Sequence, residues 1–177
     1  MSYLTYKEIK RRNSGGFTLV ELLIVIAIIA IIAAVLFVAL NPLRRFQDSR
    51  DASRWHDVTE LLHAIVVDQV DNGGHYLSAI GSITTGTIYM IGTCTAGPTS
   101  SPSFTCDTAP NTPTTTGCVD LTGLVNEGYI AEVPVSPNGT GQWFASATGY
   151  TLQTSSTGAV TLRACESENQ TEIFLRR

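Results

Sequence analysis

The chain has 177 residues and a formal net charge of −4, enough for one modest domain and a membrane anchor. Beyond residue 16 it carries seven basic and fourteen acidic residues, and no basic stripe with interleaved aromatic residues is present. Nucleic-acid binding therefore has no electrostatic support. The sequence also lacks the P-loop, G-x-G-x-x-G, G-x-S-x-G and H-E-x-x-H motifs, so we expect no enzyme activity.

The N-terminal region consists of a basic segment followed by an apolar one. Residues 1–16 hold four basic residues against one acid and end in two glycines. Residues 17–40 contain one charge, Glu21, and as a helix span about 36 Å, more than the roughly 30 Å of a hydrocarbon core. The positive-inside rule predicts a cytoplasmic N-terminus and an exported remainder. A secretory signal is the weaker interpretation, because no A-x-A-like site follows the apolar run.

After Pro42 the pattern becomes amphipathic, which is typical of a helix packed against a globular domain. We expect one long helix from residue 17 to about residue 71, kinked or loosened at Pro42, which has no backbone N–H. The sequence Asn-Gly-Gly at residues 72–74 ends it. The predicted apolar face consists of Ala52, Trp55, Val58, Leu62, Ile65, Val66 and Val70. The predicted polar face includes Asp48, Asp51, Arg54, Asp57, Glu60 and Asp68.

Residues 73–177 are predicted to form a globular β domain of short strands separated by glycine-containing turns. We expect strands at residues 87–92, 142–147, 150–154 and 159–164, the last three as an antiparallel meander, and a short helix within residues 118–130. Residues 93–117 form a Thr/Ser/Pro-rich loop whose composition cannot build a core. The predicted fold class is α+β, with a long N-terminal helix packed on a C-terminal antiparallel sheet.

Four cysteines, Cys94, Cys106, Cys118 and Cys165, all lie in the predicted exported part. An even number of cysteines outside the cytoplasm favours disulfides, and their spacing fits no common zinc site. Three connectivities are possible, and free buried thiols are the alternative. We prefer Cys94–Cys106 with Cys118–Cys165, because the first pair closes a short loop. The loop of residues 93–117 is then a disulfide-pinned surface loop, with an O-glycosylated patch as the alternative.

The sequence GFTLVE at residues 16–21 resembles the N-terminal processing and methylation signal of bacterial type IV pilins and type II secretion pseudopilins. The resemblance continues through the apolar helix and is only architectural beyond Gly74. The segment at residues 124–137 is similar to the loop before the sheet of G-type major pseudopilins. The resemblance implies cleavage after Gly16 by a membrane aspartic peptidase, the prepilin peptidase, and methylation of the new Phe17 amine. Gly16 has no side chain, so a peptidase can approach the backbone closely.

A carboxylate such as Glu21 within a membrane costs on the order of 2.5–3.5 kcal/mol and therefore needs a partner. The resemblance implies that Glu21 meets the Phe17 amine of a neighbouring subunit in the core of a filament. Such a pair sets the axial register of the subunits more than it adds stability. The alternative is that Glu21 lies near the membrane interface and stays hydrated, without a further role.

The resemblance implies a structural subunit of a type IV pilus-like or type II secretion pseudopilus filament, polymerised through its N-terminal helix. The implied partners are the prepilin peptidase, an inner-membrane assembly platform, and copies of itself or other pilin-like subunits. Before assembly the chain is a single-pass protein of the cytoplasmic membrane; afterwards it is part of a periplasmic or cell-surface filament. The alternative function is a membrane-anchored extracytoplasmic binding domain that does not polymerise.

Two groups of residues are candidates for metal binding. His56, Glu60 and His63 lie on one helical face, but the two histidines are about 10 Å apart along the axis, so surface residues are the better interpretation. Asp120 and Glu127 lie where some G-type pseudopilins bind calcium, although no clustered loop of oxygen ligands is evident. We expect no cofactor, with calcium as the open alternative.

Overall fold

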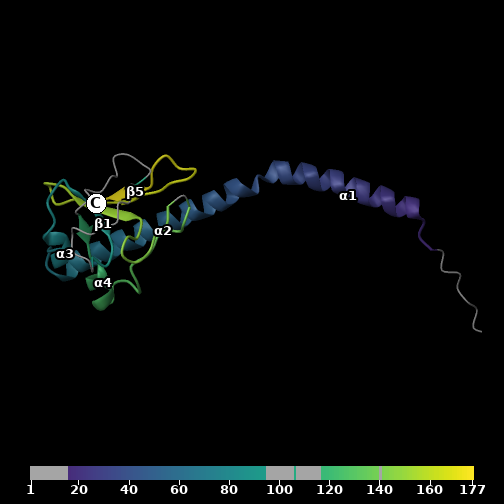
Figure 1. The fold of residues 1–177 in the computed structure, drawn as a ribbon. Helices are drawn as coiled ribbons and strands as arrows, with labels where there is room; N and C mark the ends of the chain where they lie inside the picture. Colours follow the sequence, from purple (N-terminus) through teal and green to yellow (C-terminus); the bar gives the residue numbers. More distant parts are fainter. Residues whose placement is uncertain (1–15, 95–105, 107–116, 140) are drawn as a thin grey trace, which may run out of the picture. The chain divides into compact units, whose positions relative to one another are not determined.

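The computed structural model describes residues 16–94, 106, 117–139 and 141–177 (Figure 1). The predicted leader, apart from Gly16, and most of the predicted loop at residues 93–117 lie outside this part of the chain. The chain divides into two compact units, one ending at Pro42 and one beginning at Leu43, and each is described by itself.

The first unit contains helix α1, which runs from Leu19 to Leu40. A capping box closes its N-terminus: the Glu21 backbone N–H donates to Thr18, and the Glu21 side chain accepts from the Thr18 backbone N–H. Every residue of α1 except Glu21 is apolar, and yet none of its residues is buried within the chain. In the described part of the chain, one helical region is long and apolar enough to cross a membrane, and its apolar stretch is α1.

A second helix, α2, spans Pro42 to Asp71, so the predicted single helix is in fact two helices separated by Asn41. Asn41 has a φ of 38°, in the left-handed region that commonly ends helices, and asparagine tolerates it better than most residues. Pro42 takes the first position of α2, where a helix has no partner for the missing N–H. The proline therefore starts a new helix instead of kinking a continuous one.

The end of α2 is closed by the two glycines that follow Asn72. Gly73 and Gly74 have φ values of 65° and 95°, which residues with a side chain rarely adopt. This turn allows the Gly74 N–H to donate to the Gln69 carbonyl at 2.7 Å, satisfying a carbonyl of the last helical turn.

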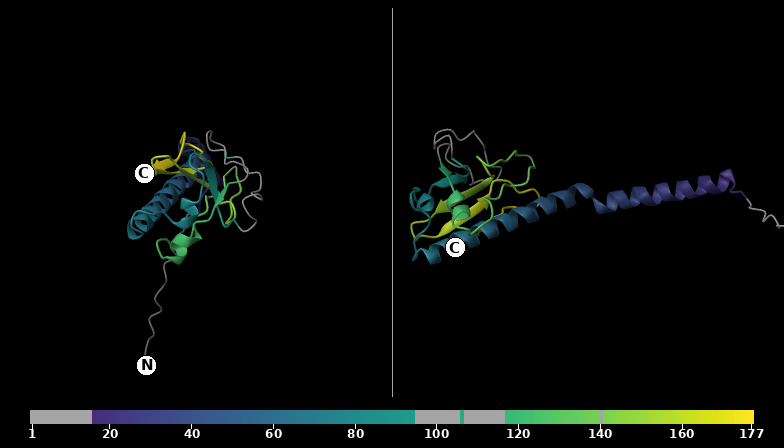
Figure 2. Two further views of the ribbon diagram at one scale, coloured as in Figure 1. Left: turned by 90° about the vertical axis from the view of Figure 1, so that its left-hand side faces the viewer. Right: turned by 90° about the horizontal axis from the view of Figure 1, so that it is seen from below.

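The second unit contains a five-stranded sheet in the order β2-β1-β3-β4-β5 (Figure 2). All neighbouring strands are antiparallel except β1 and β2, which run parallel. The predicted α+β, pilin-like class is confirmed, with one parallel pair in the sheet that was predicted to be antiparallel. The strands are β1 (Ile88–Ile91), β2 (Cys118–Val119), β3 (Tyr150–Thr154), β4 (Val160–Ala164) and β5 (Phe174–Arg176); two short helices are α3 (Ser78–Gly81) and α4 (Thr122–Asn126).

The predicted strand at residues 142–147 is wrong. This segment turns back on itself, and Phe144 and Ala147 exchange two backbone hydrogen bonds as an isolated bridge. The meander consists instead of β3, β4 and β5, and β5 was not among the predicted strands. The other three predicted strands and the short helix within residues 118–130 are confirmed as β1, β3, β4 and α4.

Helix α2 covers one face of the sheet, and the main hydrophobic core lies between them (Figures 1 and 2). Because strand side chains alternate between faces, Tyr150 and Leu152 of β3 both point into this core. A smaller cluster on the other side of the sheet includes Met90, Trp143 and Cys165. The main core includes Val58, Leu61, Ala64 and Ile65 of α2, Ile91 of β1, and Val160 and Leu162 of β4.

The buried face of α2 differs from the predicted one. Ala52 and Val70 of the predicted apolar face are exposed. Asp51, Arg54 and Asp68 of the predicted polar face are at most 2% exposed. The buried stripe therefore has charged residues at both ends; it runs through Asp51, Arg54, Val58, Leu61, Ile65 and Asp68, at alternating steps of three and four residues.

Candidate assembly site and the anchor of helix α2

The predicted cleavage site lies immediately before α1, outside the helix. Phe17 is 85% exposed, and Thr18 is in an extended conformation as the N-cap of α1. The Glu21 carboxylate turns back over this first turn, and its Oε2 accepts hydrogen bonds from the Thr18 backbone N–H at 2.9 Å and from Thr18 Oγ1 at 2.8 Å. The arrangement places a carboxylate beside the residue that follows Phe17, and it leaves the Gly16–Phe17 bond in non-helical backbone.

Residues 11–37 match the family model described as the prokaryotic N-terminal methylation motif. This motif is the prepilin signal of type IV pilins and pseudopilins. The match supports a pilin-like or pseudopilin subunit that is processed by a prepilin peptidase, and such subunits are structural proteins. No curated protein and no solved structure matches the chain.

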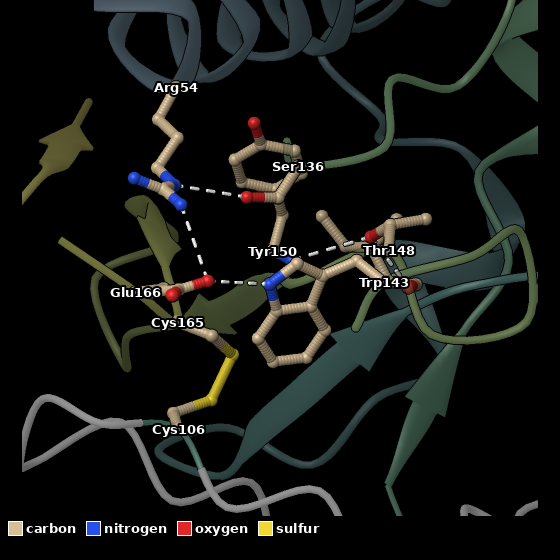
Figure 3. The surroundings of a disulfide bond; sticks show 9 residues. Arg54, Cys106, Ser136, Trp143, Thr148, Tyr150, Cys165 and Glu166 are labelled. Atoms are coloured by element: carbon tan, nitrogen blue, oxygen red, sulfur yellow. Dashed lines mark hydrogen bonds and ion pairs between the residues drawn. A yellow bond between two sulfur atoms is a disulfide. The ribbon is translucent and has the colours of Figure 1, made fainter. Parts of the chain in front are cut away.

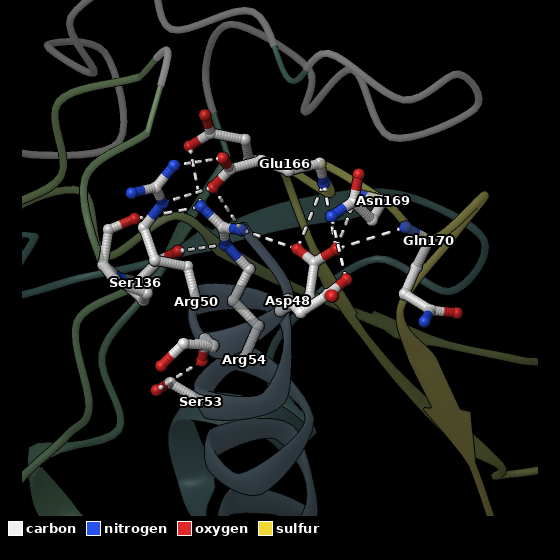
Figure 4. Close-up of polar contacts among 12 residues, drawn as sticks. Asp48, Arg50, Ser53, Arg54, Ser136, Glu166, Asn169 and Gln170 are labelled. Atoms are coloured by element: carbon white, nitrogen blue, oxygen red, sulfur yellow. Dashed lines mark hydrogen bonds and ion pairs between the residues drawn. The ribbon is translucent and has the colours of Figure 1, made fainter. Parts of the chain in front are cut away.

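In the second unit, a buried arginine anchors the start of α2 to the C-terminal part of the chain (Figure 4). Arg54 is completely buried, and its Nη1 donates to Asp51 at 2.8 Å and to Glu168 at 3.1 Å. Its Nη2 lies 3.2 Å from Glu166, and its Nε donates to Ser136 at 3.1 Å. One guanidinium thus joins three carboxylates from two distant segments. This cluster was not predicted from the sequence. The one sequence signal for it is that Asp51 and Arg54 continue the three-four spacing of the buried residues of α2.

The Asp51 carboxylate holds the C-terminal segment through its backbone. The N–H groups of Glu168, Asn169 and Gln170 all donate to it, at 3.1, 2.8 and 3.1 Å respectively. Burial raises the pKa of Asp51, but these hydrogen bonds, together with that from Arg54, outweigh burial and hold its pKa below the usual range. The hydrogen bonds from Arg50 similarly lower the pKa of Glu168.

These lowered pKa values predict that the domain loses stability in acid. Because Asp51 and Glu168 bind protons more weakly in the folded state than in the unfolded state, their contribution is complete above their unfolded pKa values, about 4. It is lost as the pH falls through the lower, folded values. Urea unfolding of the full chain in detergent, followed by circular dichroism, should give a constant free energy of unfolding from pH 7 to about 5 and a decline below about pH 4. Asp51→Asn should make this decline shallower; an unchanged slope would contradict the assignment.

Glu166 connects this cluster to the disulfide on the other side of the sheet (Figure 3). It is 1% exposed, and its Oε2 accepts from Trp143 Nε1 at 2.9 Å and lies 3.2 Å from Arg54 Nη2. The next residue back along the chain is Cys165, which packs against Trp143. The buried indole N–H and the buried carboxylate therefore each have a hydrogen-bond partner, as is usual for buried polar groups.

The predicted disulfides are present, but the preferred pairing is wrong. The bonds are Cys94–Cys118 and Cys106–Cys165, with S–S distances of 1.99 and 2.03 Å. Cys118 lies in β2, and its neighbouring strand β1 ends shortly before Cys94. A Cys118–Cys165 bond is impossible in this sheet, because β1 and β3 separate β2 from β4 by three strand spacings, about 14 Å, whereas disulfides need Cα atoms within about 7 Å.

The residues considered for metal binding are not brought together into a cluster. His56 Nδ1 lies 3.8 Å from Glu60, and both His56 and His63 are exposed. Asp120 instead accepts a hydrogen bond from the Thr122 backbone N–H at 2.8 Å. Within the residues that the structure describes, no group of three or more histidine, cysteine, aspartate or glutamate side chains is placed to hold a metal ion.

Proposed function

We propose that this chain is a subunit of a pilus-like or pseudopilus filament, cleaved between Gly16 and Phe17 and methylated on the Phe17 amine. The observation that carries the proposal is a prepilin signal leading directly into α1, a 22-residue apolar helix that the chain itself does not bury. So much exposed apolar surface is unfavourable in water. A membrane covers α1 before assembly, and the α1 helices of neighbouring subunits cover it afterwards.

In this proposal Glu21 pairs with the Phe17 amine of a neighbouring subunit. Both hydrogen bonds from Thr18 end on Oε2, so Oε1 is available to a cation that arrives from outside the chain. Cleavage creates that cation, because the new N-terminus is an amine. Inside an apolar bundle either charge alone would be costly, so the pair selects the register in which both are satisfied.

Cleavage is tested by mass spectrometry of the chain extracted from membranes of cells that contain a prepilin peptidase. The mature form should begin at methylated Phe17. Gly16→Leu should reduce the mature form at least tenfold, because a side chain before the scissile bond prevents the close approach of the enzyme.

The matched control for that experiment is Gly81→Leu, since Gly81 is exposed at the end of α3 and a side-chain carbon there meets no atom within 4 Å. Its processing should equal that of the unmodified chain. A chain that keeps its first sixteen residues in these cells would refute the proposal.

One observation favours a second candidate, an anchored binding domain. A pocket of about 400 Å³ lies beside α4. Its lining is mostly apolar and includes Val125 and Val133, and two carboxylates, those of Asp120 and Glu132, also line it. Apolar pockets with a few polar groups are typical of small-molecule sites. An anchored binding domain does not polymerise, so the presence or absence of the unmodified chain in sheared filaments, measured as described in the Discussion, separates the two candidates.

Pilus and pseudopilus versions of the filament are separated by imaging cells with and without the gene. A pilus subunit gives long surface filaments that disappear on deletion. A pseudopilus subunit gives no such filaments at normal expression, and its deletion instead stops the export of secreted proteins.

A further inference from the structure

The two disulfides of this chain are interleaved. Cys106 lies between Cys94 and Cys118, which are bonded to each other across 24 residues of sequence. Its own partner is Cys165, the last cysteine of the chain, 59 residues away. Neither native bond therefore joins cysteines that are consecutive in the sequence.

Chain statistics favour the wrong bonds. Cys106 is twelve residues from both Cys94 and Cys118. The probability that a flexible loop closes falls as roughly the −3/2 power of its length. A Cys94–Cys106 bond is therefore about threefold more probable than Cys94–Cys118, and about tenfold more probable than Cys106–Cys165. The two bonds that close the shortest loops, Cys94–Cys106 and Cys106–Cys118, both use Cys106. Its native partner, Cys165, is the last cysteine to be exported if the chain crosses the membrane from its N-terminal side.

The folded domain is incompatible with the mispaired form that contains Cys94–Cys106, so this form has to be corrected before the domain folds. A Cys118–Cys165 bond, the complement of Cys94–Cys106, would have to reach across β1 and β3. In the native fold Cys165 is completely buried and packs against Met90 and Trp143. A thiolate from solvent cannot approach the Cys165 sulfur there, so exchange has to precede closure of this cluster.

From the interleaved pairing and the burial of Cys165 we infer that a thiol–disulfide isomerase is a folding partner of this chain. In the cell this step rests on the export that belongs to the proposed function, since disulfides form outside the reducing cytoplasm. The partner is a dithiol enzyme with a reactive thiolate, and its target is the newly exported chain with Cys106 wrongly bonded.

The exchange conserves disulfides. The enzyme thiolate attacks Cys94 Sγ of a Cys94–Cys106 bond, forming a mixed disulfide and releasing the Cys106 thiolate. That thiolate attacks Cys165 Sγ of the Cys118–Cys165 bond and releases the Cys118 thiolate. The Cys118 thiolate then attacks Cys94 Sγ in the mixed disulfide, which completes Cys94–Cys118 and frees the enzyme thiolate. Two protein disulfides exist before and after, so no oxidant is consumed.

The test uses the full chain, reduced and denatured, then diluted into detergent micelles with a glutathione redox buffer, with or without protein disulfide isomerase. Free thiols are alkylated at intervals, and the bonds are identified by mass spectrometry of non-reduced peptides. Without the enzyme, most of the first bonds should join Cys106 to Cys94 or Cys118. The enzyme should raise the rate at which both native bonds form at least fivefold.

The matched control combines Cys106→Ser with Cys165→Ser, which leaves one possible bond, Cys94–Cys118. The enzyme also oxidises thiols, so it should speed this bond as well, but by a smaller factor than it speeds formation of the two native bonds in the unmodified chain. Native bonds that form first and equally fast without enzyme in the unmodified chain would overturn the inference. The assay involves neither export nor cleavage, so its failure leaves the filament proposal intact, and an uncleaved leader would leave the assay result intact.

Discussion

Replacing Glu21 by alanine should reduce incorporation of the subunit into filaments at least tenfold. In the proposed filament, the variant leaves the Phe17 amine of a neighbouring subunit without its carboxylate in an apolar helix bundle. Breaking a buried ion pair on one side costs about 3–5 kcal/mol. Residues 43–177 should stay folded, because α1 and these residues form separate compact units. The measurement is the amount of subunit in sheared filaments relative to the amount in membranes. Glu60→Ala, which removes an exposed acid from α2, should assemble normally.

A second variant at the same position separates the two contacts that Glu21 can make. Glu21→Gln keeps an oxygen that accepts from Thr18, so the capping box survives, but it removes the negative charge. If pairing with the neighbouring amine is the role of Glu21, this variant should fail to assemble like the alanine variant. Normal assembly of both variants would refute a filament role for Glu21. Absence of the unmodified chain from sheared filaments would favour the anchored binding domain.

Replacing Arg54 by alanine should lower the free energy of unfolding of the β domain by about 3–5 kcal/mol. Arg54 is completely buried against Asp51 and Glu166, whose exposures are 2% and 1%. Its loss leaves these two carboxylates buried without their cation, and it also removes one of the links between α2 and the C-terminal segment. Urea unfolding of the full chain in detergent, followed by circular dichroism, measures the effect.

Two further variants test this interpretation. Arg45→Ala removes an exposed arginine from the same helix and should change the free energy of unfolding by no more than about 0.5 kcal/mol. Arg54→Lys keeps the charge but loses the planar fork, so its stability should lie between those of the alanine variant and the unmodified chain. Equal stability of the alanine variant and the unmodified chain would show that the cluster does not hold α2 in place.

The features that could be predicted from the sequence depend on residues close together in the chain. The prepilin signal combines Gly16, Phe17 and Glu21 within six residues, ahead of an uninterrupted apolar run. The boundaries of β3 follow from a β-branched and aromatic segment ending before a turn. Local backbone preference and local charge decide such features, so they can be predicted without knowledge of the fold.

The buried face of α2, the disulfide pairing and the shape of residues 142–147 were decided only by the tertiary structure. Arg54 and Asp51 carry charges, which periodicity assigns to the solvent side, and their partner Glu168 lies 114 and 117 residues away in the chain. Cys118 and Cys165 are kept apart by the order of strands in the sheet. The energy of a buried charge or a disulfide depends on which distant group arrives beside it, and that is a property of the assembled fold, not of any local stretch of sequence.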